Sequence, residues 1–89
     1  MNLVKYFENR VYQNPQKPFL VEEIGGEVKR ELTYQKTWDG LCNVANNLGQ
    51  SHLRPQERVA VILPNSPELI MVWFGVNAVG AVACMLEPI

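Results

Sequence analysis

The residue types that build most active sites are scarce in this sequence. Its 89 residues include one histidine, His52, and two cysteines, Cys42 and Cys84. Two cysteines outside a Cys-x-x-Cys motif are too few for a disulfide framework, and with a single histidine they do not match the ligand spacing of a zinc site. We therefore predict reduced, packed thiols, no bound metal and a cytoplasmic protein.

Charge is sparse as well, with 19% charged residues and a formal net charge of −1. A nucleic-acid-binding domain needs a basic patch, and a membrane-surface segment needs a cluster of Lys and Arg. Neither is present, so we expect no nucleic-acid partner. Near the N-terminus, Lys5, Glu8 and Arg10 interrupt the apolar residues, and this pattern does not match a signal peptide.

The longest run without a charge covers residues 69–86, and its 18 residues reach only the lower limit for a membrane span. Asn77, the helix-ending Gly80 and the acidic flanks Glu68 and Glu87 argue against spanning. A buried helix followed by a buried strand accounts for the same uncharged run, so we predict no transmembrane segment.

Motifs with a known phosphate-binding or nucleophilic mechanism are also missing: Gly-x-Gly-x-x-Gly, GxxxxGK[ST], Gly-x-Ser-x-Gly and HExxH. A helix start at Ser66 could attract an anion, but Pro67 has no N–H and Glu68 is an acid, so a structural cap is favoured. Cys42 and Cys84 have no charged or histidine neighbour that would activate them. We predict no catalytic, cofactor-binding or metal-binding residue.

What the sequence does contain centres on a βαβ unit. Residues 59–63 form a continuous apolar run, typical of a strand covered on both faces. Ser66 then caps a helix over residues 67 to about 79, and Gly80 supplies the left-handed residue that ends it. Residues 81–86 form a second apolar run of strand length. A crossover of this size joins parallel strands, with right-handed connection.

A hairpin precedes this unit, over residues 19–32, with its turn at Gly25-Gly26. The predicted register sets Glu22 opposite Lys29 as a favourable charge pair, with Ile24 opposite Glu27 and Phe19 opposite Leu32. One face then collects apolar side chains, those of Phe19, Val21, Val28 and Leu32. The other face is charged, and we interpret it as solvated rather than as a carboxylate dyad.

Two amphipathic helices complete the prediction. The first covers residues 2–13 and places Leu3, Phe7 and Val11 on one face. The second covers residues 33–48 with Thr33 as its N-cap. Its apolar stripe consists of Tyr34, Trp38, Leu41, Ala45 and Leu48. The predicted fold class is therefore α/β: a βαβ unit with a flanking helix and a hairpin.

Five short stretches, in this order, resemble the N-terminus of the adenylate-forming (AMP-binding) enzymes, most closely the acyl-CoA synthetases. They are LTY at residues 32–34, RPQERV at 54–59, LPNSPE at 63–68, VGAV at 79–82 and MLEP at 85–88. Three residues depart from the family pattern: Gln56 replaces the usual glycine, Glu57 an aspartate and Glu87 an asparagine. Gln56 implies a turn that does not need a positive φ.

The resemblance implies that residues 1–89 are one partial domain, the start of an AMP-binding N-terminal domain. The parent ligase would use ATP and magnesium to activate a carboxylate, such as a fatty acid, to an acyl-adenylate, and would then transfer the acyl group to coenzyme A or another thiol. The family's phosphate loop, nucleotide-binding motifs and catalytic lysine have no counterpart among these residues. The resemblance therefore carries no catalytic residue and no bound cofactor onto this segment, which we expect to be inactive alone.

The partners implied are the remainder of the parent enzyme or a second copy of the chain. An alternative stays open, namely a free-standing, non-catalytic α/β module that binds another protein. The DNA downstream of Ile89 would discriminate the two, because only the ligase hypothesis requires an open frame that encodes a Ser/Thr/Gly-rich loop with a lysine.

Overall fold

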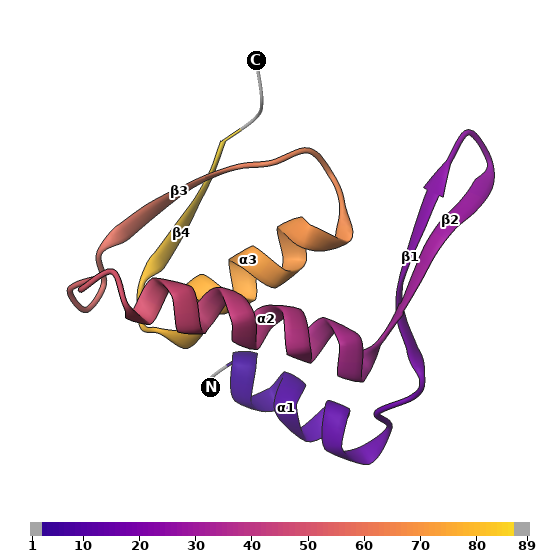
Figure 1. Cartoon of the computed structure of the whole chain (residues 1–89), viewed down its shortest axis with the longest axis horizontal. Helices are drawn as coiled ribbons and strands as arrows, with labels where there is room; N and C mark the ends of the chain where they lie inside the picture. Colours follow the sequence, from indigo (N-terminus) through magenta and orange to yellow (C-terminus); the bar gives the residue numbers. More distant parts are fainter. Residues whose placement is uncertain (1–2, 87–89) are drawn as a thin grey trace.

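In the computed structural model, which describes residues 3–86, three helices and two two-stranded sheets follow one another along the chain (Figure 1). The elements are α1 (Leu3–Gln13), β1 (Pro18–Ile24), β2 (Glu27–Thr33), α2 (Tyr34–Gly49), β3 (Arg58–Ile62), α3 (Pro67–Ala78) and β4 (Val82–Leu86). This arrangement confirms the predicted α/β class and its βαβ unit with a flanking helix and hairpin.

Strands β3 and β4 pair in parallel, from Arg58 opposite Val82 to Ile62 opposite Leu86. The chain returns between them through α3, which ends before Gly80 at a φ of +80°. The N–H of Gly80 donates to the carbonyl of Asn77 at 3.1 Å and closes the last turn. The predicted break at Gly80 is thus confirmed, and no helix within residues 3–86 is long and apolar enough to cross a membrane.

The turn into β3 departs from the sequence-based prediction. Gln56 has a φ of +64°, although we expected a turn without a positive φ. Pro55 precedes it, and the N–H of Glu57 donates to the carbonyl of Arg54 at 3.1 Å. A proline followed by a left-handed residue is typical of a type II turn, which favours glycine at the second of these positions. The prediction at Gln56 was wrong because the turn keeps its positive φ even though glutamine replaces the usual glycine.

Strands β1 and β2 form the expected antiparallel hairpin, in which Ile24 pairs with Glu27 as predicted. The rest of the predicted register is wrong. Glu22 lies opposite Arg30 rather than Lys29, because the pairing shifts between Glu22 and Glu23. A second shift near the base of the hairpin brings Leu20 rather than Phe19 opposite Leu32. Irregularities of this kind insert a residue into one strand, and they cannot be predicted from the alternation of polar and apolar side chains.

The hairpin extends away from the three helices (Figure 1), so most of it has no core to face. Leu32 is buried and Phe19 half-buried at its base, whereas Val21 and Val28 are 54% and 57% exposed. The apolar face expected along the hairpin is therefore covered only where the hairpin meets the helices.

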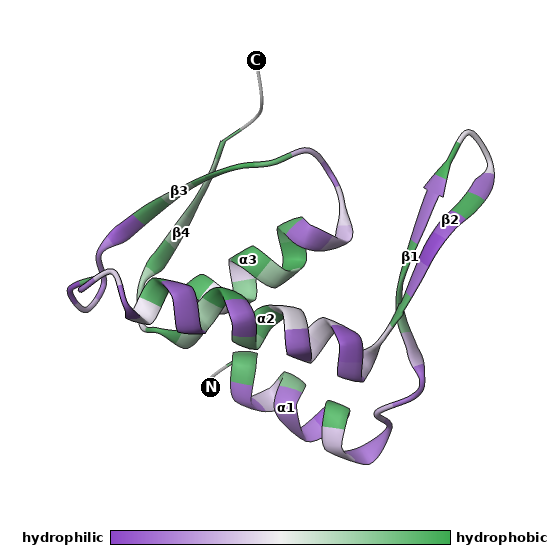
Figure 2. Ribbon diagram, in the orientation of Figure 1, coloured by the Kyte–Doolittle hydropathy of each residue, from purple (hydrophilic) through white to green (hydrophobic). Residues whose placement is uncertain are grey.

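The core lies among the three helices. It contains Val4, Phe7 and Val11 of α1, Leu41 of α2 and Phe74 of α3. Leu3, expected on this stripe, is 43% exposed, because the buried positions of α1 begin one residue later, at Val4. Figure 2 shows the difference between α1, where polar and apolar residues alternate, and α3, which is apolar over most of its length.

Helices α2 and α3 cross closely at two glycines. A side chain added at Gly40 would meet the sulfur of Met71, and one added at Gly75 would lie 2.5 Å from Val44 Cγ1 and 3.2 Å from the carbonyl oxygen of Leu41. The N-terminus of α2 is fixed by Thr33, whose hydroxyl accepts a hydrogen bond from the N–H of Lys36 at 3.1 Å. The predicted N-cap is thereby confirmed.

Candidate functional site

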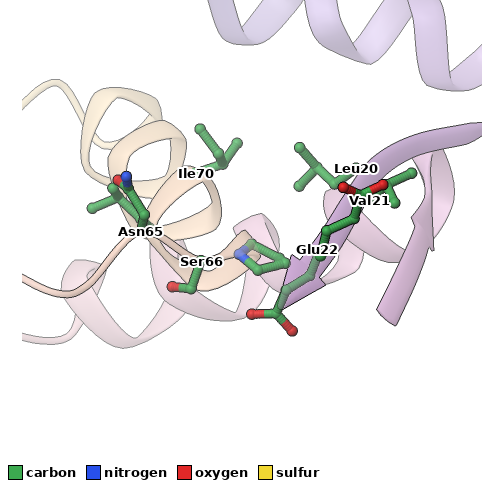
Figure 3. A pocket seen from close by; sticks show the side chains of 9 residues that line it. Leu20, Val21, Glu22, Asn65, Ser66 and Ile70 are labelled. Atoms are coloured by element: carbon green, nitrogen blue, oxygen red, sulfur yellow. The ribbon is translucent and has the colours of Figure 1, made fainter. Parts of the chain in front are cut away.

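A hollow of about 310 Å³ separates β1 from the start of α3 (Figure 3). Its lining is Leu20, Val21, Glu22, Glu23, Asn65, Ser66, Pro67, Leu69 and Ile70. In Figure 3 the side chains of Leu20 and Ile70 flank the apolar part of the gap, and Glu22 and Ser66 carry oxygens at its other side. The hollow thus combines apolar walls with two carboxylates and the first turn of a helix.

One of these carboxylates is already neutralised by Arg30. The Nε atom of Arg30 donates to Glu22 Oε1 at 2.8 Å, and its two terminal nitrogens donate to the carboxylate of Glu68 at 2.6 and 2.7 Å. These charge-assisted bonds raise the pKa of Arg30 and, in the other direction, hold the pKa of Glu68 below its usual value. Arg30 therefore fastens the hairpin to the N-terminus of α3, beside the hollow.

This contact could not be predicted from local sequence patterns, because Arg30 and Glu68 are 38 positions apart. The charged face of the hairpin was expected to be solvated. It is partly so, since the side chains of Arg30 and Glu68 are 43% and 48% exposed. The partner of Arg30 can be identified only in the folded structure, where α3 lies next to the hairpin.

The helix start at Ser66 does not have the expected side-chain cap. The Ser66 hydroxyl donates to the carbonyl of Pro64 at 3.1 Å and makes no bond to the N–H groups of α3. Pro67 does occupy the beginning of the helix, as predicted. With the proline lacking a donor and Glu68 adding a negative charge in the first turn, this helix end is poorly suited to phosphate.

A second hollow, of about 470 Å³, lies at the carboxyl ends of β3 and β4. It is lined by Val61, Leu63, Pro64, Asn65, Leu69, Met85 and Leu86. In α/β sheets the carboxyl ends of the strands are the usual place for ligands. Here Asn65 is the only polar side chain of the described lining, so the hollow offers few side-chain groups that could bind a ligand.

The cysteines and the histidine do not come together into a reactive group. Cys42 and Cys84 are both free and half-buried, and burial together with the charges of Asp39 and Glu8 raises the pKa of the Cys42 thiol. A raised pKa leaves the thiol protonated at neutral pH and unreactive. Over the described part of the chain, no three His, Cys, Asp or Glu side chains gather as metal ligands would.

Comparison with known proteins identifies the family. Residues 7–89 match the sequence model of the AMP-binding enzymes, that is, nearly the whole chain. The chain therefore belongs to the AMP-binding enzyme family, which confirms the resemblance drawn from its five motifs.

Two curated proteins are similar in sequence. The 4-coumarate–CoA ligase 2 of Nicotiana tabacum is 30% identical over 66 residues, which are 74% of this chain. The long-chain fatty acid transport protein 6 of Homo sapiens is 32% identical over 82 residues, or 91% of this chain. The chain spans only 12% of the length of each of these proteins.

Solved structures show the same fold. A fatty acid AMP ligase from Legionella pneumophila superposes with a TM-score of 0.91 at 21% identity, over 98% of this chain and 15% of that one. The N-terminal subdomain of Klebsiella oxytoca NpsA gives a TM-score of 0.84 at 21% identity, over 97% and 21% of the two chains. The architecture is thus that of a part of larger proteins.

Proposed function

We propose that this chain is the N-terminal scaffold part of an ATP-dependent acid–thiol ligase. The observation that carries the proposal is the family match over residues 7–89, together with two relatives of which the chain spans 12%. The reaction would convert a carboxylate and ATP, with magnesium, into an acyl-adenylate and pyrophosphate. The acyl group would then pass to coenzyme A or another thiol, in the cytoplasm.

In this proposal residues 1–89 are a single partial domain that supplies no catalytic, cofactor-binding or metal-binding residue. The described hollows support this role, since one carboxylate beside the first is held by Arg30 and the side chains that line the second are apolar apart from Asn65. The βαβ unit and the α2–α3 crossing would hold the frame on which the nucleotide-binding part is built.

The test is exchange of labelled pyrophosphate into ATP, with magnesium and a panel of fatty and aromatic acids. We expect exchange by the longest product of the gene, and none by residues 1–89 alone, because this segment lacks the groups that hold a triphosphate. Deletion of residues 1–89 from the longer product should abolish exchange. Exchange by the isolated segment, in a preparation proven free of host ligases, would contradict the assignment of a scaffold role.

A non-catalytic interaction module remains the second candidate, and one observation favours it. The outer face of the β3–β4 pair exposes Ile62, Val82 and Leu86, an apolar surface suited to a protein partner. A natural stop codon after Ile89 in an expressed gene, with no ligase segment nearby, would support this candidate and contradict the ligase proposal.

A further inference from the structure

The β1–β2 hairpin is attached to the helices at its base. There Leu32 is buried. The centroid of the Phe19 ring lies 4.9 Å from that of Phe7 and 4.8 Å from that of Tyr34. Beyond this base the hairpin extends away from the helices (Figure 1), and residues 23–31 are all exposed. Burial therefore fixes the base of the hairpin but not the direction of its distal part.

Arg30 provides the polar attachment of the distal part. It lies opposite Glu22 in the strand pair and also reaches Glu68 of α3, with hydrogen bonds of 2.8 Å to the first and of 2.6 and 2.7 Å to the second. In the part of the chain that the structure describes, the hydrogen bonds found between the hairpin and α3 are those to Glu68. Glu22 belongs to one wall of the first hollow, and Glu68 lies between Pro67 and Leu69 of the opposite wall. Arg30 thus links the two walls.

Opening the contact between Arg30 and Glu68 would leave neither charge without stabilisation. Arg30 would keep Glu22, because these two residues lie on paired strands of the hairpin itself. Glu68 is 48% exposed and lies in the first turn of α3, where water and the positive helix end both stabilise a carboxylate. Exposed ion pairs contribute little in net. The closed and open positions of the hairpin therefore differ little in free energy.

We propose that the contact between Arg30 and Glu68 is a latch: it holds the hairpin against α3, and the hairpin pivots about its base when the contact opens. Pivoting widens the first hollow, because the wall that contains Glu22 moves with the hairpin. High salt favours the open position, since screening weakens an attraction between exposed charges. The two strands stay paired in both positions, because their backbone pairing does not involve α3.

The experiment measures the distance between the hairpin tip and α3 by electron paramagnetic resonance. Nitroxide labels are placed on Ile24→Cys and Ala78→Cys, both at exposed positions, in the longest product of the gene with its other cysteines replaced by alanine. We expect one narrow distance distribution at low salt and a second population at about 1 M salt. Hydrogen exchange of the paired hairpin amides should stay unchanged, because the hairpin moves as a unit.

Arg30→Gln is the decisive variant, and it should raise the second population at low salt by up to about fivefold, which matches the strength of an exposed ion pair. Lys29→Gln is the matched control: it removes the same charge from the same strand, but Lys29 pairs with Glu27 inside the hairpin. Arg30→Glu alone should open the hairpin further. Combining it with Glu68→Arg should restore the narrow distribution, because the opposite charges again face each other.

Three results would overturn the proposal. Equal effects of Arg30→Gln and Lys29→Gln would mean that net charge, not the latch, sets the distance. A distribution that neither salt nor any variant changes would mean that the rest of the parent protein holds the hairpin. Faster amide exchange within the hairpin would indicate local unfolding instead of a pivot. Because the readout is a distance and not pyrophosphate exchange, each result leaves the ligase proposal untouched.

Discussion

At the scale of single residues, the turn into β3 places a non-glycine residue, Gln56, in a left-handed conformation. Its φ of +64° lies in the region that favours glycine, and its N–H donates to the carbonyl of Gly80 at 2.9 Å. A β-branched side chain is the least tolerated in this region. We expect Gln56→Val to lower the free energy of unfolding by about 1–2 kcal/mol relative to Gln56→Gly.

Urea denaturation of the two Gln56 variants, followed by circular dichroism, measures this difference. The comparison between variants at one position cancels the loss of the glutamine side chain itself. Equal midpoints for valine and glycine would show that the turn relaxes to a different conformation.

Also at the scale of single residues, the ion pairs of Arg30 predict that stability depends on pH. The pKa of Glu68 lies below its ordinary value of 4.5, chiefly because Arg30 donates hydrogen bonds to the carboxylate. A lowered pKa in the folded state means that the contribution of Glu68 to stability is present above pH 4.5 and is lost as the pH falls through the folded value. The coupling between Arg30 and Glu68 should therefore be present at neutral pH and vanish in acid.

A double-mutant cycle with Arg30→Gln and Glu68→Gln measures this coupling, at neutral pH and over a series of decreasing pH values that passes below the usual carboxylate range, because the pKa of Glu68 is itself lowered. Because both side chains are substantially exposed, the coupling should also shrink in high salt. A coupling that persists unchanged in acid would mean that the two residues interact through packing rather than through charge.

At the scale of elements, the crossing of α2 and α3 depends on Gly75. A Cβ at this position would lie 2.5 Å from Val44 Cγ1 and 3.2 Å from the carbonyl oxygen of Leu41, and this backbone atom cannot move away by a change of rotamer. We expect Gly75→Ala to lower the free energy of unfolding by about 1–3 kcal/mol, because the helices must separate.

Gly49→Ala is the matched control for this substitution. Gly49 lies at the end of α2 with nothing within 4 Å of an added Cβ, so alanine there should be neutral or should stabilise by up to about 1 kcal/mol. Thermal unfolding of both variants gives the comparison. A loss of stability at Gly49 equal to that at Gly75 would contradict the role of close helix contact.

These elements also show what could be predicted from the sequence. The stop at Gly80, the cap at Thr33 and the parallel pairing of β3 with β4 each follow from local residue chemistry, and each is confirmed. The shift between Glu22 and Glu23 and the contact of Arg30 with Glu68 were missed. The shift is a local irregularity that strand alternation does not encode, and the contact depends on where the hairpin lies relative to α3. The predicted absence of site residues stays a prediction.

At the scale of the whole molecule, the exposed apolar face of the β3–β4 pair predicts self-association of the isolated segment. Ile62 and Leu86 lie opposite each other on this face, and Ile62 is 59% exposed. Both strands also have a free edge in the described part of the chain, where the sheet order is only β3–β4. We expect residues 1–89 to form dimers or larger species at micromolar concentration, measured by analytical ultracentrifugation.

Ile62→Lys should shift this segment toward the monomer, because it places a charge on the apolar face, opposite Leu86. Tyr12→Lys is the control: Tyr12 is an apolar residue that is 90% exposed, but it lies on α1. A monodisperse wild-type monomer that binds no hydrophobic dye and melts cooperatively would contradict the prediction and favour the free-standing module.

The parallel pairing of β3 with β4 also sets an order of folding. The β1–β2 hairpin closes over a two-residue turn, and such local pairs form in about 1–10 μs. Strand β4, by contrast, reaches β3 only after α3 has formed and reversed the chain, so that pair closes a longer loop and follows later. On a ribosome the helices and the hairpin would thus be in place first, and β3 would wait unpaired until Leu86 has left the exit tunnel.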